Sequence, residues 1–298
     1  GAHRADVILP GAAYTEKDGI YVGLDYDTYA RISAVNQSYL NQFAKSPLHA
    51  QYWKAMGGSD ETPARAFGSA VHLAILEPAN FASEVLCVPK VDKRTKAGKK
   101  EWADFQAKAD GRIILQPDEH DRVKHVARSI VEHPTARQLF ASKGANEVSI
   151  VWTDPETGVR CKARVDRITE LNGTPVVMDL KTTRDVTPRK FQGSLVDYGY
   201  DIQAGFSLAG LDVLRPIANG SAPQRVFVIL AVESDGPFDV GVFHLNEEAV
   251  LHAQQRIRRM LKQYAQCKAS GVWPGKVGDG VELLDLPEWQ YKREPLAA

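Results

Sequence analysis

The most constraining stretch of this chain runs from Lys162 to Arg184 and predicts two strands joined by a tight turn. Asn172-Gly173 separates two runs of strand-forming residues, and both residues tolerate the positive φ that a two-residue hairpin turn requires. The second run, 175–182, is mostly apolar, which is typical of a central strand covered on both faces. The sequence therefore predicts an antiparallel strand pair in the middle of a sheet.

Two carboxylates and a lysine interrupt this apolar pair. Asp179 and Lys181 are two residues apart, so their side chains point to the same face of the second strand, and Asp166 on the first strand can reach that face. Charged groups on such a strand are costly to bury without a purpose. Mg²⁺ and Mn²⁺ prefer oxygen ligands, which Asp166, Asp179 and the Leu180 carbonyl would supply. Lys181 would orient or deprotonate an attacking water, or oppose charge on a phosphodiester in its transition state.

Other candidate residues surround this strand pair. Asp-x-Lys taken alone also occurs on surface strands, and Asp166 upstream makes the pattern more specific. His72 lies on a predicted helix beside Gly68, Ser69 and Ala70, whose small size permits close approach to a sheet or to DNA. It is either a packed histidine without a function or a metal ligand supplied from outside the sheet. Glu147 is either an additional acid of the site or a surface glutamate.

The periodicity of the chain predicts helices first, then strands and helices in alternation. We expect a short strand or extended arm over 19–29 and an N-cap at Ser33. The expected helices are 36–45, 47–56, 63–76, 102–109, 117–132, 135–140, 191–198, 200–213 and 246–270. The expected strands are 147–152, 159–168, 175–182, 225–233 and 238–245. This order predicts an α/β (α+β) fold, with a central mixed β-sheet flanked by helices and an N-terminal helical part.

We divide the chain into a flexible lead-in over 1–18 and a single domain over 19–298. Within that domain we expect a helical part at 33–140, a sheet core at 145–245 and a C-terminal helix at 246–270. No internal repeat is evident, and no stretch has the composition of a linker.

The composition limits the partners. The formal net charge is zero, so any binding of nucleic acid must use local patches such as the basic run 90–100. That run is either a solvated loop or a phosphate contact. No long apolar run predicts a membrane span. The three cysteines lack metal-binding spacing, which argues against zinc or an iron–sulfur cluster and favours the reducing cytoplasm.

Several motifs together carry a family resemblance. They are Gly19-Ile-Tyr, Gln37-Ser-Tyr-Leu, Lys45-Ser-Pro-Leu-His49, the segment 68–78 with His72, Ala163-Arg-Val-Asp166, and Val177-Met-Asp179-Leu-Lys181-Thr-Thr. With them, the chain from about residue 19 to about residue 270 resembles the PD-(D/E)XK nuclease superfamily. The resemblance is to its RecB-like branch and to nuclease domains of the exonuclease VIII (RecE) type. It implies a restriction-endonuclease-like fold.

The resemblance also implies an activity. Such nucleases are metal-dependent 5′-to-3′ exonucleases that act at double-stranded DNA ends and leave a 3′ single strand for a single-strand-annealing recombinase. By position, His72 would be a metal ligand, Asp166 and Asp179 would bridge to the Mg²⁺, and Lys181 would be the catalytic lysine. Members of this type form rings around DNA, which suggests a homo-oligomer, a tetramer by resemblance.

Positions around the following helix match the RecB-like pattern in part. Gln203 matches its glutamine, but Ser207 stands where an aromatic residue often follows. Tyr200, one turn before Gln203, is a substitute for that aromatic residue. Thr182 is either a phosphate contact or a plain strand exit.

Two other functions remain open at this point. One is a catalytically silent DNA-binding or scaffolding module that kept the fold. The other is a RecB-like nuclease of different polarity. An iron–sulfur nuclease of this kind would need four cluster cysteines, and a helicase-linked nuclease would usually accompany a phosphate-binding Gly-x-x-x-x-Gly-Lys-Ser/Thr loop; the sequence has neither.

Overall fold

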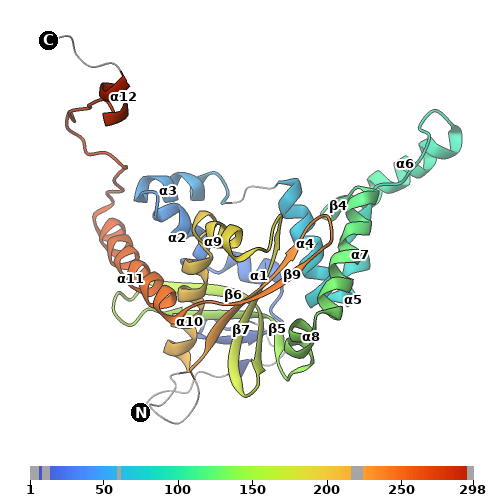
Figure 1. Ribbon diagram of the computed structural model, residues 1–298, viewed down its shortest axis with the longest axis horizontal. Helices are drawn as coiled ribbons and strands as arrows, with labels where there is room; N and C mark the ends of the chain where they lie inside the picture. Colours follow the sequence, from blue (N-terminus) through green and yellow to red (C-terminus); the bar gives the residue numbers. More distant parts are fainter. Residues whose placement is uncertain (1–6, 9–13, 59–61, 216–223, 294–298) are drawn as a thin grey trace.

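A seven-stranded mixed sheet forms the centre of the computed structural model, which describes residues 7–8, 14–58, 62–215 and 224–293 (Figure 1). The strand order is β1-β2-β5-β6-β7-β8-β9. The strands are β1 Val7–Ile8, β2 Gly19–Val22, β5 Ala145–Thr153, β6 Arg160–Leu171, β7 Thr174–Thr183, β8 Val226–Glu233 and β9 Val240–His244. Neighbours from β2 to β7 are antiparallel, β7 and β8 are parallel, and β9 is antiparallel to β8. The predicted α/β class with a mixed sheet is confirmed.

Helices cover both faces of this sheet (Figure 1). The helices before the central strands are α1 Tyr26–Arg31, α2 Gln37–Phe43, α3 Pro47–Ala55, α4 Pro63–Leu76, α5 Pro78–Glu84, α6 Lys96–Lys108, α7 Pro117–Glu132 and α8 Pro134–Ala141. Those after them are α9 Pro188–Asp197, α10 Tyr200–Leu214, α11 Glu247–Ser270 and α12 Glu288–Arg293. A separate two-stranded sheet joins β3 Val85–Cys87 to β4 Ile113–Leu115. Among the described residues, no helix is long and apolar enough to cross a membrane.

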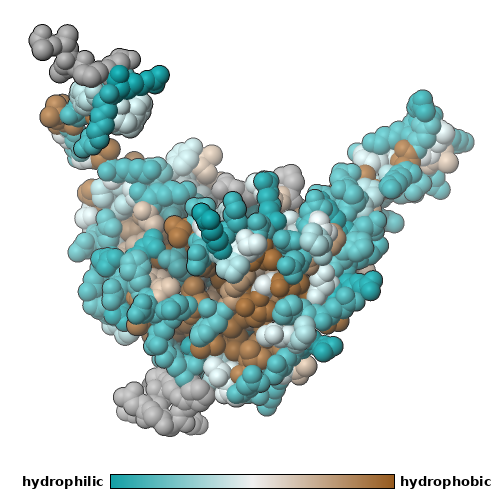
Figure 2. Space-filling model, in the orientation of Figure 1, coloured by the Kyte–Doolittle hydropathy of each residue, from teal (hydrophilic) through white to brown (hydrophobic). Residues whose placement is uncertain are grey.

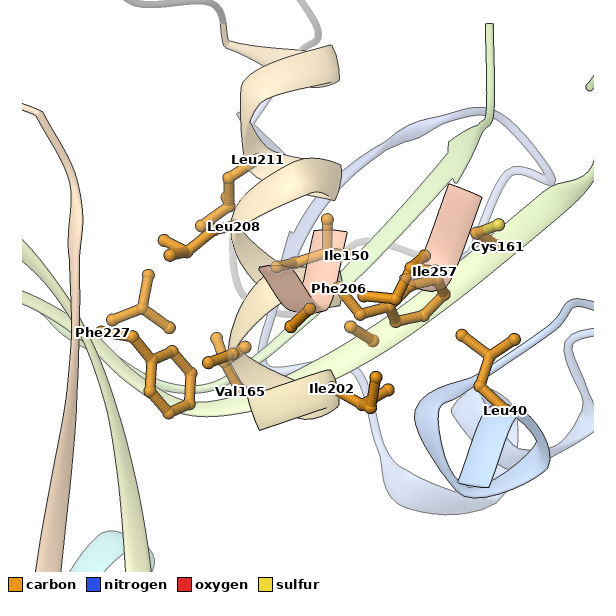
Figure 3. Packing of buried hydrophobic residues seen from close by; sticks show 14 of the residues in the cluster. Leu40, Ile150, Cys161, Val165, Ile202, Phe206, Leu208, Leu211, Phe227 and Ile257 are labelled. Atoms are coloured by element: carbon orange, nitrogen blue, oxygen red, sulfur yellow. The ribbon is translucent and has the colours of Figure 1, made fainter. Parts of the chain in front are cut away.

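The central strands are buried on both faces, as the apolar run 175–182 predicts. On one face Val177 and Phe227 join a cluster formed with α2, α10 and α11. On the other face Met178 and Val228 join a cluster formed with α4, α7 and α8. Figure 3 shows the first cluster, in which Ile202, Phe206, Leu208 and Leu211 of α10 lie over the sheet residues Ile150, Val165 and Phe227. Helix α10 is therefore fixed against the strands that carry the acids.

A smaller cluster lies beneath α1, where Tyr29 and Ile32 pack on Tyr21 and Val151. The buried Lys162 of β6 closes this helix, because its Nζ donates to the carbonyls of Tyr29, Ala30 and Ile32 at 2.8, 3.0 and 2.9 Å. An ammonium at the carbonyl end of a helix is favourably placed.

Strands β5 and β6 both change phase at one level of the sheet. On β5, Ala145 and Val148 both face the α10 cluster although they are three positions apart. Val165 and Ile168 do the same on β6. In a regular strand, residues that share a face are an even number of positions apart. On β5 the alternation breaks at Glu147, whose φ is 52°. On β6 it breaks at Asp166, and the paired register of the two strands skips both residues. Both acids therefore leave the regular pleat at the same level.

Several local expectations are wrong. Helix α2 is capped by Asn36, whose side chain accepts from Tyr39 N at 2.9 Å, and not by Ser33. Part of the expected extended arm 19–29 is helical, because Asp25 caps α1 through Thr28 N at 2.8 Å. The basic run 90–100 is not all loop, since Thr95 caps α6 and Lys96–Lys100 form its first turns. Helix α6 projects from the body on an arm whose surface is largely hydrophilic (Figures 1 and 2).

The lead-in predicted over 1–18 is held against the sheet where it is described. Val7–Ile8 pair with β2. The Tyr14 hydroxyl accepts from the Arg160 guanidinium at 2.9 Å, and Asp18 accepts from Thr153 N at 2.6 Å. Residues 1–6 and 9–13 lie outside the described residues.

Candidate active site

Asp179 and Lys181 lie side by side on β7, as their spacing predicts. Lys181 Nζ is 2.5 Å from Asp179 Oδ2, and both side chains are largely buried. Gln203 of α10 donates through Nε2 to Asp179 Oδ1 at 2.5 Å. The Lys181 ammonium also lies 4.9 Å from the centre of the Tyr200 ring. Helix α10 therefore brings both of its predicted residues to the acid and the lysine on the strand.

Asp166 and His72 converge on the backbone of Leu180. The paired register of β6 and β7 ends at Arg167 and Met178, and beyond it the Asp166 carboxylate accepts from Leu180 N at 2.6 Å. His72, carried by α4 on the other side of the sheet, bonds through Nε2 to the Leu180 carbonyl at 2.8 Å. Its Nδ1 lies 3.5 Å from Asp166 Oδ2. The Leu180 carbonyl, which was predicted to be a metal ligand, is therefore hydrogen-bonded to His72 in this structure.

Glu147 belongs to the same group. Ligand atoms of His72, Glu147 and Asp166 all lie within 4.8 Å of one another. The Glu147 carboxylate accepts from Arg164 Nε at 2.7 Å, and Arg164 also donates to the Leu24 carbonyl at 2.7 Å. Glu147 has a left-handed φ, and its side chain is only 17% exposed and lies beside His72 and Asp166 rather than on the open surface.

Burial and the closeness of neighbouring charges shift the pKa values of this group. Burial, reinforced by the charge of Asp179, raises the pKa of Asp166. Burial and the charge of Asp166 likewise raise the pKa of Glu147. Burial opposes the charged form of Lys181, but the carboxylates of Asp179 and Asp166 outweigh it and raise its pKa. Burial and nearby Lys181 lower the pKa of His72, which favours the neutral imidazole.

These residues fit a divalent cation. Asp179 Oδ2 is buried, and the Lys181 ammonium lies 2.5 Å from it. If Nε2 of a neutral His72 donates to Leu180, the lone pair of Nδ1 faces the Asp166 carboxylate. Three carboxylates and a neutral imidazole with crowded lone pairs are the donor set of a hard to borderline divalent ion. A bound cation would offset the repulsion that raises the pKa values of these acids.

The other predicted positions differ in what they contact. The Thr182 hydroxyl lies 3.4 Å from the position of a Cβ built on Gly68, so α4 approaches β7 closely there. The small side of α4 therefore serves to approach the sheet. Ser207 is buried in the core beside Phe206, so it contributes nothing to an outer surface. Tyr200 is half-buried and stacks with the exposed Tyr198, their ring centres 5.6 Å apart.

Two residues that shape the site were missed from the sequence. Arg164 orients Glu147, and its signal was its place in the alternating charged and apolar pattern of β6. Gly199 begins α10 with a φ of 66°, and a Cβ there would lie 2.4 Å from Asn41 Oδ1. Asn41 in turn donates to the Tyr198 carbonyl at 3.1 Å. Glycine at this turn had no distinguishing signal among the other glycines of the chain.

Comparison with known families agrees with this geometry. The model of a family described as a PDDEXK-like domain of unknown function (DUF3799) matches residues 36–285, more than half of the chain. The chain belongs to this family. The predicted membership of the PD-(D/E)XK superfamily is therefore confirmed, and the site described above lies within the matched part. A molybdopterin oxidoreductase model also matches residues 1–41, a short segment that holds none of the candidate metal ligands.

A solved structure shares the fold of this DUF3799 member. A protein from Eubacterium rectale whose name marks it as a candidate exonuclease is 13% identical, with a TM-score of 0.55. The match covers 92% of this chain and 99% of that one. Matches to SSO0001 (14% identity, 80% and 98% covered) and to VC1899 from Vibrio cholerae (10%, 79% and 56%) have TM-scores of only 0.28 and 0.22 and carry no argument. No curated protein matches the chain.

Proposed function

We propose that this PDDEXK-like protein is a metal-dependent exodeoxyribonuclease that hydrolyses phosphodiester bonds at the ends of linear double-stranded DNA. The observation that carries the proposal is the convergence of His72, Glu147, Asp166, Asp179 and Lys181 at the end of the paired register of β6 and β7. Mg²⁺ is the proposed cofactor, with Mn²⁺ as a substitute.

Each group has a distinct role in this proposal. His72, Glu147, Asp166 and Asp179 would hold the cation, which when bound supplies Lewis acidity at the scissile phosphate and a water of lowered pKa. Lys181, fixed beside Asp179, opposes the negative charge that develops on the phosphate oxygens. Gln203 restrains the Asp179 carboxylate through the bond to Oδ1, so its rotamer is set before substrate binds.

The finer parts of the proposal rest on the family resemblance. We propose 5′-to-3′ polarity, a 3′ single-stranded product that a single-strand-annealing recombinase would take, and a homo-oligomer. The Eubacterium rectale protein of the same fold is named as a candidate exonuclease, which is in keeping with the proposed action at ends.

One digestion tests activity, end dependence and polarity together. Linear duplex labelled at either the 5′ or the 3′ end is incubated with protein and Mg²⁺ or Mn²⁺, beside a covalently closed circle. We expect early release of the 5′ label, an intact circle, and no digestion in EDTA. Lys181→Met should lower the rate by at least about 10²-fold, whereas the matched change Lys190→Met on the exposed surface of α9 should not. Digestion that persists in chelator, or a Lys181→Met protein with the original rate, would contradict the proposal.

A further inference from the structure

After α11 the described chain continues into a segment whose large apolar side chains are exposed. After α11 ends at Gly271, Trp273 contacts Tyr264 with ring centres 5.8 Å apart, and the Pro274 carbonyl accepts from Leu48 N at 3.1 Å. Beyond this anchor the chain leaves the body, and α12 has no buried residue (Figure 1). Leu283 and Leu284 are 99% and 94% exposed, and the large apolar residues 277, 281, 286 and 289 are exposed as well.

Such exposure is unfavourable in water, because each leucine side chain left uncovered forgoes the stabilisation that its burial would give. Scattered exposed leucines are normal, but a run of them on one segment indicates an interaction site. In Figure 2 the part of the chain that carries α12 shows apolar and hydrophilic surface side by side, clear of the body. We refer to residues 277–293 as the tail.

The tail also has a net negative charge. Between Val277 and Trp289 it carries Asp279, Glu282, Asp285 and Glu288 and no lysine or arginine; Lys292 and Arg293 follow in α12, where Lys292 pairs with Glu288. Its apolar residues alternate with these acids in Val281-Glu-Leu-Leu-Asp-Leu. A segment of this kind fits a surface that is cationic and partly apolar.

One cavity of the described chain has this character. It encloses about 750 Å³ between the α1–α2 loop, the end of α3, the β5–β6 turn and the last turns of α11. Its described lining includes five lysines and arginines and no carboxylate. Lys162 and Arg160 already donate to groups of their own chain, but Lys54 and Lys268 are exposed and form no ion pair with any described residue. The aromatic side chains of Trp53, Tyr39 and Tyr264 form part of the cavity wall.

An apolar track leads to this cavity. Leu48, Tyr52 and Met56 follow one another at intervals of four residues, so they share one face along and just beyond α3. They are 51%, 68% and 68% exposed. Trp53 and Lys54 of the same helix line the cavity, so the track lies on another face of a helix that forms part of the cavity wall.

We propose that the tail of one copy of this chain binds the basic cavity and the α3 track of a second copy. Charge and apolar character are complementary between the two surfaces. In its own chain the tail leads away from α3 (Figure 1). A contact between different surfaces of two copies closes either as a reciprocal exchange of tails or as a ring. This inference concerns assembly and does not depend on the proposed nuclease activity.

The first test uses the full chain and its mass in solution, measured by light scattering over a range of concentrations. The wild type should be an oligomer. The pair Leu283→Ser and Leu284→Ser in the tail should lower the mass, and so should Lys54→Glu with Lys268→Glu in the cavity. Combining that cavity pair with Glu282→Lys and Asp285→Lys should restore the oligomer. The matched exposed pair Val196→Ser and Leu251→Ser should leave the mass unchanged. A wild type that stays a single copy would overturn the proposal.

A second measurement identifies what the cavity binds. A fluorescent peptide of residues 277–293 should bind the Leu283→Ser, Leu284→Ser protein, and Lys54→Glu with Lys268→Glu should weaken that binding by at least about tenfold. A single-stranded oligonucleotide serves as the competing probe. If the cavity pair weakens binding of the oligonucleotide but leaves both the peptide affinity and the oligomer unchanged, the cavity is a nucleic-acid site and the proposal is wrong.

Discussion

Glu147 reaches the site because one backbone angle departs from the strand, and its contribution can be separated from that of the neighbouring acids. Its ligand atom lies within 4.8 Å of those of His72 and Asp166. Glu147→Gln keeps the size of the side chain but removes its charge, so we expect Mn²⁺ affinity to fall by at least about tenfold. Calorimetric titration of Mn²⁺ into the folded protein measures this.

The matched control for this change is Glu156→Gln. Glu156 is half-exposed in a surface pair with Lys262 and should leave Mn²⁺ affinity unchanged. Equal affinity of the Glu147→Gln and wild-type proteins would show that the cation is held by other acids.

The raised pKa of Asp166 makes the stability of the metal-free protein depend on pH. Burial and the charge of Asp179 raise this pKa to about 8. A carboxyl that holds its proton more tightly in the folded chain than in the unfolded one stabilises the fold while protonated. That stabilisation is lost as the pH rises from the ordinary carboxyl pKa, near 4, to about 8. In EDTA we therefore expect the Tm to fall between about pH 5 and about pH 8.

Two comparisons isolate the cause of this pH dependence. Asp166→Asn should flatten the profile, since no proton is bound at that position. Added Mn²⁺ should reverse the trend, because the cation binds the deprotonated acids and its affinity rises with pH. Thermal melts across this pH range measure both effects. An unchanged profile in Asp166→Asn would assign the dependence to other groups.

At the level of elements, one buried arginine connects the sheet to the helices beside the site. Arg167 of β6 donates to the carbonyls of Leu139, Phe140 and Ser142 around the end of α8, at 3.1, 3.1 and 2.8 Å. It also bonds Asn146, which donates to the Leu76 carbonyl at the end of α4 at 2.8 Å. Helix α4, which carries His72, is thus tied to the sheet through these polar groups.

We expect Arg167→Met to lower the free energy of unfolding by roughly 2–4 kcal/mol, because several buried acceptors would be without their donor. Urea denaturation measures the loss. Arg128→Met on the exposed face of α7 removes a guanidinium whose partner among the described residues is the exposed Glu132, and it should change the midpoint little. An Arg167→Met protein as stable as the wild type would show that water replaces the arginine at no net cost.

Local sequence signals predicted the central strand pair and part of the site. Asn172-Gly173 and the apolar run after it predicted β6, β7 and the placement of Asp179 beside Lys181, because turn chemistry and strand alternation are local. The phase change at Glu147 could not be predicted. It arises where β5 and β6 together leave the pleat, and a non-glycine residue with positive φ has no clear signature in sequence.

The first turns of a helix in a polar stretch were missed for a related reason. Helix α6 overlaps the helix expected over 102–109 but begins at Lys96, within a lysine-rich run with little apolar periodicity. Thr95 caps it there, and Gly98 lets the preceding loop approach. A Cβ on Gly98 would lie 2.1 Å from the Asp92 carbonyl oxygen. Such an arrangement depends on one close approach rather than on a repeating pattern.

Over the whole molecule the formal net charge is zero, but two projecting segments carry opposite charges. The segment 90–112, which forms the arm around α6, holds eight lysines and arginines against four acids, whereas the tail is acidic up to Trp289. The arm extends from the side of the molecule that carries α4 and α7 (Figures 1 and 2). On the proposed function, this arm is the part of the described chain best placed to meet the phosphates of a duplex beyond the site.

Replacing Lys96, Lys99 and Lys100 by glutamine tests the arm, since all three are exposed on α6. Removing one lysine–phosphate pair should reduce the salt dependence of duplex binding by about 0.9 in the log–log slope, so the triple change should lower the slope by roughly 2–3. Affinity should fall most at low salt, while the rate at saturating DNA stays the same because none of the three is near Asp179. The same change of three exposed α11 residues, Arg258, Arg259 and Lys262, should leave the slope unaltered. If both triple variants lower the slope equally, binding follows net charge alone and the arm has no special role.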